Sequence, residues 1–171
     1  TLQIMAGQIL GLNKLFPNVF PSHLINSTDL LEKNNLVDQV IGAFFLIRRK
    51  VFECCNGFDE RFFVYFEEVD LSLRVKQLGY SSHILTDVSA FHRGGGSSNQ
   101  VKADRLFYSL RSRILYAKKH YSRTEFIALV LLTWLELPLR FIQGAAKGSW
   151  SDVHNTFFAY KHLVAHFVRR A

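Results

Sequence analysis

Residues 37–47 read VDQVIGAFFLI, a nearly unbroken run of apolar, β-branched and aromatic side chains. Strands that are covered on both faces have this composition, because neither face needs polar residues. The stretch therefore predicts a central strand of a sheet with helices on both faces. We expect an α/β fold built around this strand.

Two helices are predicted directly after the strand. Residues 48–55 stop at Asn56-Gly57, which is typical of the C-terminal end of a short helix. Residues 67–78 place apolar side chains at positions i, i+4 and i+7, carry acidic residues in the first turn and end at Gly79. Both ends of this second helix are therefore signalled by the sequence.

Two further short strands are predicted over residues 80–85 and 88–91. Residues 92–98 then have the composition of a loop, with three consecutive glycines. We therefore expect residues 1–100 to form one α/β domain.

The remaining residues, 101–171, change character. Three helices are predicted in them, over residues 103–121, 126–142 and 152–170. The formal charge is +8 here and −1 over residues 1–100. The unbroken apolar stretch, residues 126–135, is shorter than the roughly 20 residues that cross a bilayer. We expect a basic amphipathic helical tail that lies on an anionic membrane surface; packing against protein, including a second copy of the chain, is the equal alternative.

Composition excludes several classes of protein. The 171 residues are 49% apolar with a formal net charge of +7, which excludes a disordered tail and allows a real core. The only two cysteines, Cys54 and Cys55, are adjacent, so a disulfide framework is excluded and a reduced, cytosolic compartment is favoured. Basic residues alternate with apolar faces, which argues against a nucleic-acid partner. The chain begins at Thr1, and we expect it to be a fragment.

Carboxylates provide the densest group of reactive side chains. Five of them are interleaved with aromatic residues, namely Asp59, Glu60, Glu67, Glu68 and Asp70. Such a group is suited to act as a general base or to hold a divalent metal, and an apolar neighbourhood raises a carboxyl pKa toward that of a useful base. The alternative is that the acids only complement the dipole at the start of a helix.

His92 lies at the end of a predicted strand. It is followed by Arg93 and then by the three glycines Gly94–Gly96. A side chain at such a position can point into a cleft, where metal ligation or phosphate contact fits. The alternative is a surface or core histidine with no ligand. The glycine loop lacks both the spacing of a dinucleotide fingerprint and the lysine of a P-loop, so no nucleotide motif is complete.

Several motifs occur together in a fixed order: GAFFLIRR at 42–49, GFDERFFVYFEEVDLSLR at 57–74, LGY at 78–80 and HRGGGS at 92–97. In this order they closely resemble the C-terminal half of family 2 glycosyltransferases, especially the rhamnosyltransferase-like branch. The resemblance extends over residues 37–121. It implies part of a GT-A fold, which is Rossmann-like with a mixed sheet. It also implies inverting transfer of a sugar, such as the rhamnose of that branch, from a nucleotide-sugar donor to an acceptor hydroxyl.

The resemblance also assigns roles on the acceptor side of the site. It implies that the acidic pair before the helix supplies the catalytic base. Glu68 is the first choice and Glu67 the second, because Glu68 stands where the family usually has Asp. Gly42 and Ala43 match a stretch that lines the acceptor or sugar pocket, and Asp70 is expected to support this pocket or to cap the helix.

On the donor side, the resemblance implies that His92 joins a divalent metal, Mg²⁺ or Mn²⁺, or the donor diphosphate. Arg93, Gly94, Gly95 and Arg113 are expected near that diphosphate. Arg111 also carries a suitable charge, but residues two apart on a helix do not face one point.

An Asp-x-Asp motif, which binds the metal in this family, is absent from residues 1–171. We therefore expect the chain to be the acceptor-side half of an enzyme and to be inactive alone. The expected acceptor is a saccharide or polyprenyl-linked molecule in cell-envelope polysaccharide synthesis, handled by a cytoplasmic protein peripheral to the plasma membrane. The alternative is a non-catalytic membrane-surface or oligomerisation module derived from such a transferase, with a homo-oligomer formed through the C-terminal helices.

Overall fold

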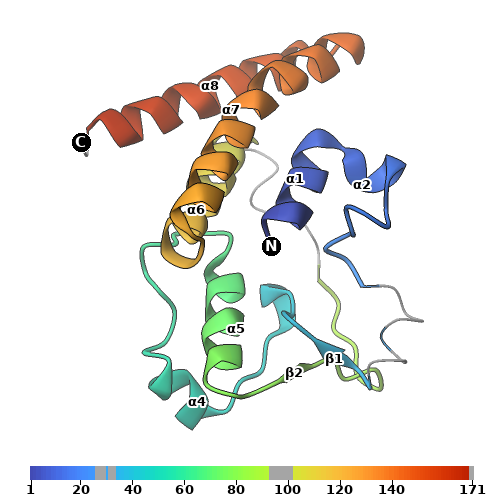
Figure 1. Cartoon of the computed structure of the whole chain (residues 1–171), viewed down its shortest axis with the longest axis vertical. Coiled ribbons are helices and arrows are strands. Elements are labelled where there is room, and N and C mark those ends of the chain that lie inside the picture. The colour runs from blue at the N-terminus through green and yellow to red at the C-terminus, as the bar shows by residue number, and fades with distance from the viewer. Residues whose placement is uncertain (26–29, 31–33, 93–101, 170–171) are drawn as a thin grey trace. The chain divides into compact units, whose positions relative to one another are not determined.

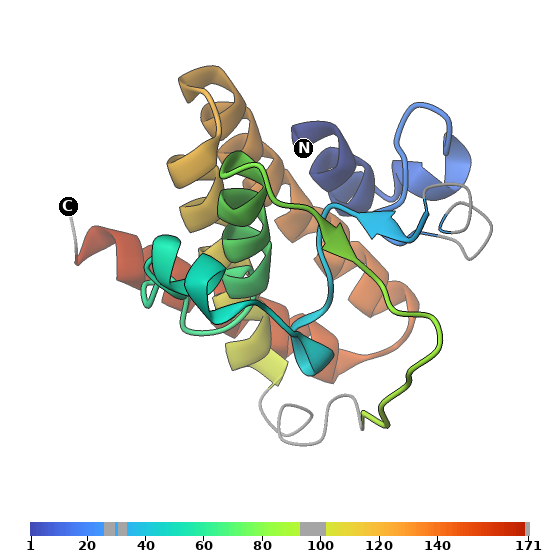
Figure 2. The ribbon, with the colours of Figure 1, turned by 90° about the horizontal axis from the view of Figure 1, so that it is seen from below.

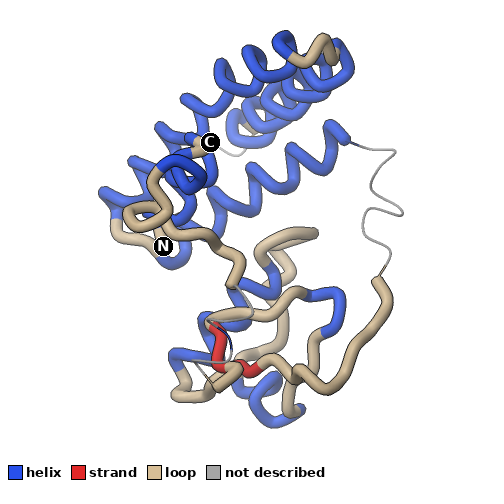
Figure 3. Tube along the Cα trace, turned by 90° about the vertical axis from the view of Figure 1, so that its right-hand side faces the viewer, coloured by secondary structure: helices blue, strands red, loops and turns tan. Residues whose placement is uncertain are grey.

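The computed structural model describes residues 1–25, 30, 34–92 and 102–169. It divides into two units. One is Leu24–Gly94, and the other, the helical unit, combines Thr1–His23 with Gly95–Ala171. Among the described residues the chain is mostly helical with one small sheet, which is compatible with part of an α/β fold (Figure 3).

The core of the Leu24–Gly94 unit lies between two helices, α4 (Arg49–Cys54) and α5 (Glu67–Gln77). Its buried residues are Val51, Cys55, Leu71 and Val75. Phe45 and Ile47 pack against this core from the preceding segment. Both helices confirm the sequence prediction, and α5 begins and ends within one residue of the predicted bounds.

The predicted central strand over residues 37–47 is wrong. In this part of the chain the strand is limited to β1 (Leu36–Val37), and Gly42–Phe44 forms a single turn of 3₁₀ helix, η1. β1 pairs antiparallel with β2 (Ser82–His83), and Leu36 lies opposite His83 (Figure 2). A long apolar strand needs neighbours along both edges, and the described residues supply β1 with a partner of two residues. The outward side chains of the run are therefore uncovered, and Leu46 is 91% exposed.

The other predicted strands are corrected in the same way. The predicted strand over residues 80–85 contracts to β2, and residues 88–91 form no strand. Within the described residues, the expected mixed, Rossmann-like sheet is thus replaced by a two-stranded antiparallel one.

Three long helices make up most of the helical unit: α6 (Lys102–His120), α7 (Arg123–Ala146) and α8 (Trp150–Val168) (Figure 1). They confirm the predicted helical tail. Ser122 begins α7 with a capping box, in which its hydroxyl accepts from the Glu125 N–H and the Glu125 side chain accepts from the Ser122 N–H. Ser149 caps α8. None of the described helices combines the length and apolarity needed to cross a bilayer.

The chain's first helices also belong to the helical unit. α1 (Leu2–Leu10) and α2 (Leu12–Leu15) are followed by residues that return along α1. Ile9 shares a buried cluster with Ala117 of α6 and Leu129 of α7, and the Tyr121 hydroxyl lies 3.6 Å from the Met5 sulfur. The expected boundary at residue 100 groups residues 1–23 with the α/β domain. The structure groups them with the C-terminal helices instead, because those helices bury the apolar face of α1.

Candidate functional site

The acidic pair Glu67-Glu68 begins α5 directly after an unusual turn. Tyr65 and Phe66 both have left-handed backbone conformations, with φ of 65° and 70°. Aromatic residues rarely adopt this conformation, and it costs of order 1–3 kcal/mol for each residue. Phe66 also gives the helix no side-chain cap. The local sequence thus holds two carboxylates at the positive end of a helix through a strained turn.

The two carboxylates are half-buried and incompletely satisfied. One oxygen of each, Oε2, is buried and accepts no hydrogen bond from any described residue. Burial raises the pKa of Glu68, and the charge of Glu67 raises it further, while the backbone N–H groups of Glu68 and Val69 oppose these effects. A half-buried carboxylate with a raised pKa and an oxygen that has no hydrogen-bond partner among the described residues is equipped to accept a proton.

Gly42 lies beside the Glu68 side chain. This fits their predicted roles, since Glu68 is the predicted base and Gly42 is predicted to line the acceptor pocket. A Cβ placed on Gly42 would lie 3.8 Å from the Cβ, Cγ and Cδ atoms of Glu68. Gly42 and Ala43 are exposed and form the first part of η1, rather than a strand. The absence of a side chain at Gly42 therefore leaves space directly over the Glu68 side chain.

Asp70 lies one turn further along α5 and is fully buried. It accepts a hydrogen bond of 2.8 Å from Nε of Arg74, and Arg74 also donates to the backbone carbonyls of Cys55 and Gly57. This ion pair ties α5 to the turn that follows α4, so Asp70 positions the helix that carries Glu67 and Glu68. Arg74 was not singled out in the sequence, although its i, i+4 spacing from Asp70 is the signal that finds it.

The five-carboxylate group separates in the structure. Asp59 is held by the Arg61 guanidinium, with an Nη2–Oδ2 distance of 2.6 Å, and Glu60 is exposed. Within this group of five, only Glu67 and Glu68 have a buried carboxylate oxygen that no described residue satisfies. The group that the sequence presents as a single cluster is therefore a pair with supporting neighbours.

The donor-side residues are placed as follows. His92 is exposed, and Arg93, Gly94 and Gly95 lie outside the described residues. Among the described residues, no three histidine, cysteine or acidic side chains come together as a metal site. The predicted Mg²⁺ or Mn²⁺ ligation by His92 therefore stays a prediction.

Arg113 lies in the helical unit and has partners of its own. It forms an ion pair with the buried carboxylate of Glu136 and donates to the Thr133 hydroxyl at 3.2 Å. Arg111 instead donates to the His166 ring at 3.2 Å. The two arginines thus face different helices, as their spacing requires, and the contacts of Arg113 give it a structural role between α6 and α7.

Comparison with known proteins identifies relatives of the chain. An N-acetylglucosaminyl-diphospho-decaprenol L-rhamnosyltransferase of Mycobacterium tuberculosis is 32% identical over 99 residues, which is 58% of this chain. Rhamnosyltransferase WbbL of Escherichia coli K12 is 30% identical over 108 residues, which is 63% of this chain. Over these residues the chain is similar to rhamnosyltransferases. It spans 29% of the length of the first relative and 38% of the second.

The rhamnosyltransferase-like resemblance predicted from the motifs is thereby confirmed. No family model matches the chain, and no solved structure matches it. Membership of family 2 and the assignment to a C-terminal half remain predictions.

Proposed function

We propose that this rhamnosyltransferase-like chain carries the catalytic base of an inverting, family 2 glycosyltransferase with a GT-A fold. The enzyme transfers a sugar, with rhamnose favoured, from a nucleotide-sugar to a saccharide or lipid-linked acceptor in cell-envelope polysaccharide synthesis. The observation that carries the proposal is the half-buried carboxylate of Glu68. One of its oxygens has no hydrogen-bond partner among the described residues, and its side chain lies beside Gly42.

In the proposed mechanism, the acceptor sugar enters the space over Gly42 and Ala43. Glu68 accepts the proton of the acceptor hydroxyl while the hydroxyl oxygen attacks the anomeric carbon of the donor. The bond from that carbon to the departing diphosphate breaks on the opposite face, so the configuration inverts. Burial, with a smaller contribution from the charge of Glu67, keeps the Glu68 pKa raised. The Asp70–Arg74 pair fixes α5 in place. A divalent metal, Mg²⁺ or Mn²⁺, would stabilise the departing diphosphate, with His92 as its ligand from this chain.

The mechanism is tested by replacing the base in the full-length gene product that contains this sequence. General-base catalysis contributes about 10²–10⁴-fold to a rate, so Glu68→Gln is expected to lower kcat on that scale with an unchanged fold. Glu68→Asp, the residue usual in the family, should keep more activity, and Glu67→Gln is the neighbouring control. Transfer is measured from a panel of nucleotide-sugars to N-acetylglucosaminyl-diphospho-polyprenol. A Glu68→Gln enzyme that retains most of its activity removes Glu68 from this role.

The exposed side chains of α7 support a proposed membrane location. Its buried face combines Leu129 with Thr133 and Glu136, and its exposed face carries a row of apolar side chains. The exposed face consists of Ile127, Leu131, Trp134, Leu135 and Ile142, which recur at i, i+4, i+7, i+8 and i+15. We name these five residues the α7 apolar face.

We propose that the α7 apolar face rests on an anionic bilayer, at the inner surface of the plasma membrane. Residues 101–171 carry a formal charge of +8, which complements an anionic leaflet. Arg123 and Lys147 stand at the two ends of α7. A tryptophan on an otherwise aliphatic face is also suited to the boundary between headgroups and acyl chains. The competing occupant is a second copy of this chain, which corresponds to the oligomerisation module.

A further inference from the structure

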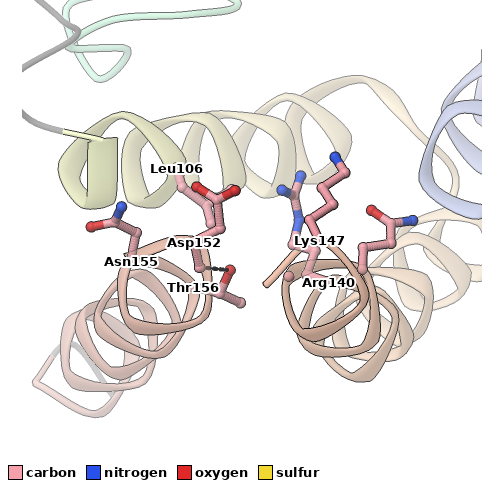
Figure 4. Close-up of a pocket in the computed structure, with 8 residues that line it drawn as sticks. Leu106, Arg140, Lys147, Asp152, Asn155 and Thr156 are labelled. Atoms are coloured by element: carbon pink, nitrogen blue, oxygen red, sulfur yellow. Dashed lines mark hydrogen bonds between the residues drawn. The ribbon is translucent and has the colours of Figure 1, made fainter. Parts of the chain in front are cut away.

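A small cavity of about 210 Å³ lies between α6, α7 and α8 in the helical unit (Figure 4). Its shape depends on two glycines. A Cβ on Gly144 would lie 2.9 Å from Cγ2 of Val153, so only glycine allows α7 and α8 to approach this closely. Gly148 turns the chain between them with a φ of 64°, and the Ser149 hydroxyl then accepts from the Asp152 N–H at 3.3 Å.

One wall of the cavity is cationic. Arg140 and Lys147 project from the α7 side (Figure 4). Arg140 donates to Glu136 at 2.7 Å, but Glu136 is also paired with Arg113, so two guanidinium groups share one buried carboxylate. The side chain of Lys147 forms no hydrogen bond or ion pair with any described residue, although its backbone N–H donates to the Gln143 carbonyl. This wall therefore has positive charge that the described side chains do not neutralise, and it suits a phosphate group.

The opposite wall offers hydrogen-bond acceptors. Asp152 and Asn155 project from α8 (Figure 4). The Asp152 carboxylate accepts from no other described side chain, and the Asn155 amide nitrogen donates to Ser151 at 3.3 Å, which leaves its oxygen available. Carboxylate and amide oxygens accept from hydroxyl groups. The same carboxylate disfavours a bare phosphate ion, because like charges repel.

The two walls require different ends of one ligand. A free phosphate leaves the acceptor wall unmatched, and a neutral sugar leaves the cations unmatched. The cavity is also smaller than the roughly 300–1,000 Å³ of pockets that enclose drug-sized ligands. We infer that this cavity binds a phosphorylated monosaccharide, with the phosphate on Arg140 and Lys147 and sugar hydroxyls on Asp152 and Asn155. The inference concerns the helical unit alone and does not rest on the proposed transfer reaction.

Binding by the 171-residue chain tests the inference without any measurement of transfer. Isothermal titration calorimetry compares a panel of hexose 1-phosphates (glucose, galactose and mannose) with inorganic phosphate and with the free hexoses. At least one hexose 1-phosphate is expected to bind about tenfold more tightly than both of its parts. Lys147→Gln should weaken that binding about tenfold, because it removes one charge-assisted contact. Lys118→Gln, an exposed α6 lysine with the same charge change, should bind like the wild type.

A second variant tests the acceptor wall. Asp152→Ala is expected to reduce the preference for the hexose phosphate over inorganic phosphate, because it removes an acceptor and a repulsive charge together. The inference is overturned if no hexose phosphate binds, or if inorganic phosphate binds equally well. Equal weakening by Lys147→Gln and Lys118→Gln also overturns it, because the affinity would then reflect only the overall charge.

Discussion

Glu68 combines features that rarely stabilise a fold. Its side chain is half-buried, its Oε2 atom has no hydrogen-bond partner among the described residues, and Glu67 lies beside it. The strained turn at Tyr65 and Phe66 adds a further cost at the same place. Proteins retain such arrangements at functional sites, where activity offsets a loss of stability.

We expect Glu68→Gln to be stabilising at neutral pH. Burial raises the pKa of Glu68 in the folded state, so the folded state binds this proton more tightly than the unfolded state. The stability that the protonated group contributes is therefore fully present below the ordinary carboxyl pKa and is lost as pH rises through the raised value. The amide has no such dependence. The Tm of Glu68→Gln relative to the wild type should thus rise by up to a few degrees between about pH 4 and pH 7.

Thermal unfolding followed by circular dichroism across this pH range measures the difference. The matched control is Glu60→Gln, which makes the same change at an exposed position. Its Tm relative to the wild type should not rise over this pH range. A Glu68→Gln protein that melts below the wild type at neutral pH would mean that the ionised carboxylate stabilises the fold.

At the scale of elements, the α7 apolar face is predicted to bind anionic vesicles. Replacing Leu131 and Leu135 together by Asp changes two exposed side chains and leaves the buried face of the helix intact. Co-sedimentation of the wild type with phosphatidylglycerol-containing vesicles is expected, and the double variant should bind at least tenfold more weakly because it loses two apolar insertions. Higher salt should also weaken binding, since it screens the basic residues.

The control for this experiment is Leu85→Asp, which changes an equally exposed leucine of the Leu24–Gly94 unit. Analytical ultracentrifugation without lipid tests the competing occupant. If the chain ignores vesicles and instead forms a dimer that the Leu131 and Leu135 changes dissociate, the α7 apolar face is an interface between copies.

The helices were predictable from the sequence because their signals are local. The acidic residues of its first turn and Gly79 at its end identify α5. The three helices predicted over residues 103–121, 126–142 and 152–170 correspond to α6, α7 and α8. Residues 37–47 were not predictable in this way. An apolar run shows that a segment avoids water, but pairing depends on neighbouring strands that lie elsewhere in sequence.

The candidate site shows the same division. The sequence motifs led to Glu67, Glu68 and Gly42 as separate assignments, and the structure adds that a Cβ on Gly42 would lie in contact with the Glu68 side chain. The long-range bonds from Arg74 to Cys55 and Gly57 were missed, because backbone carbonyls carry no signal in the sequence. Arg113 had the charge expected of a phosphate ligand, but its partner Glu136 lies 23 residues away and comes close only through helix packing.

At the scale of the whole molecule, the candidate base and the α7 apolar face belong to different units. The Asp-x-Asp motif of the family is absent from both. We therefore expect residues 1–171, purified alone, to show no sugar transfer, while the full-length gene product that contains them is active. The assay is release of nucleoside diphosphate with donor and lipid-linked acceptor present. Turnover by the 171-residue chain would show that its own residues suffice to hold the donor.

The adjacent cysteines of α4 differ sharply in accessibility, since Cys54 is exposed and Cys55 is buried in the core with Leu71 and Val75. A thiol-reactive dye added under native conditions therefore has one accessible attachment point, on the unit that carries Glu68. The wild-type sequence thus supplies a single attachment point for a fluorescent reporter on the Leu24–Gly94 unit, without the removal of a competing thiol. Reaction at Cys55 in addition would serve as a direct signal that this core has opened.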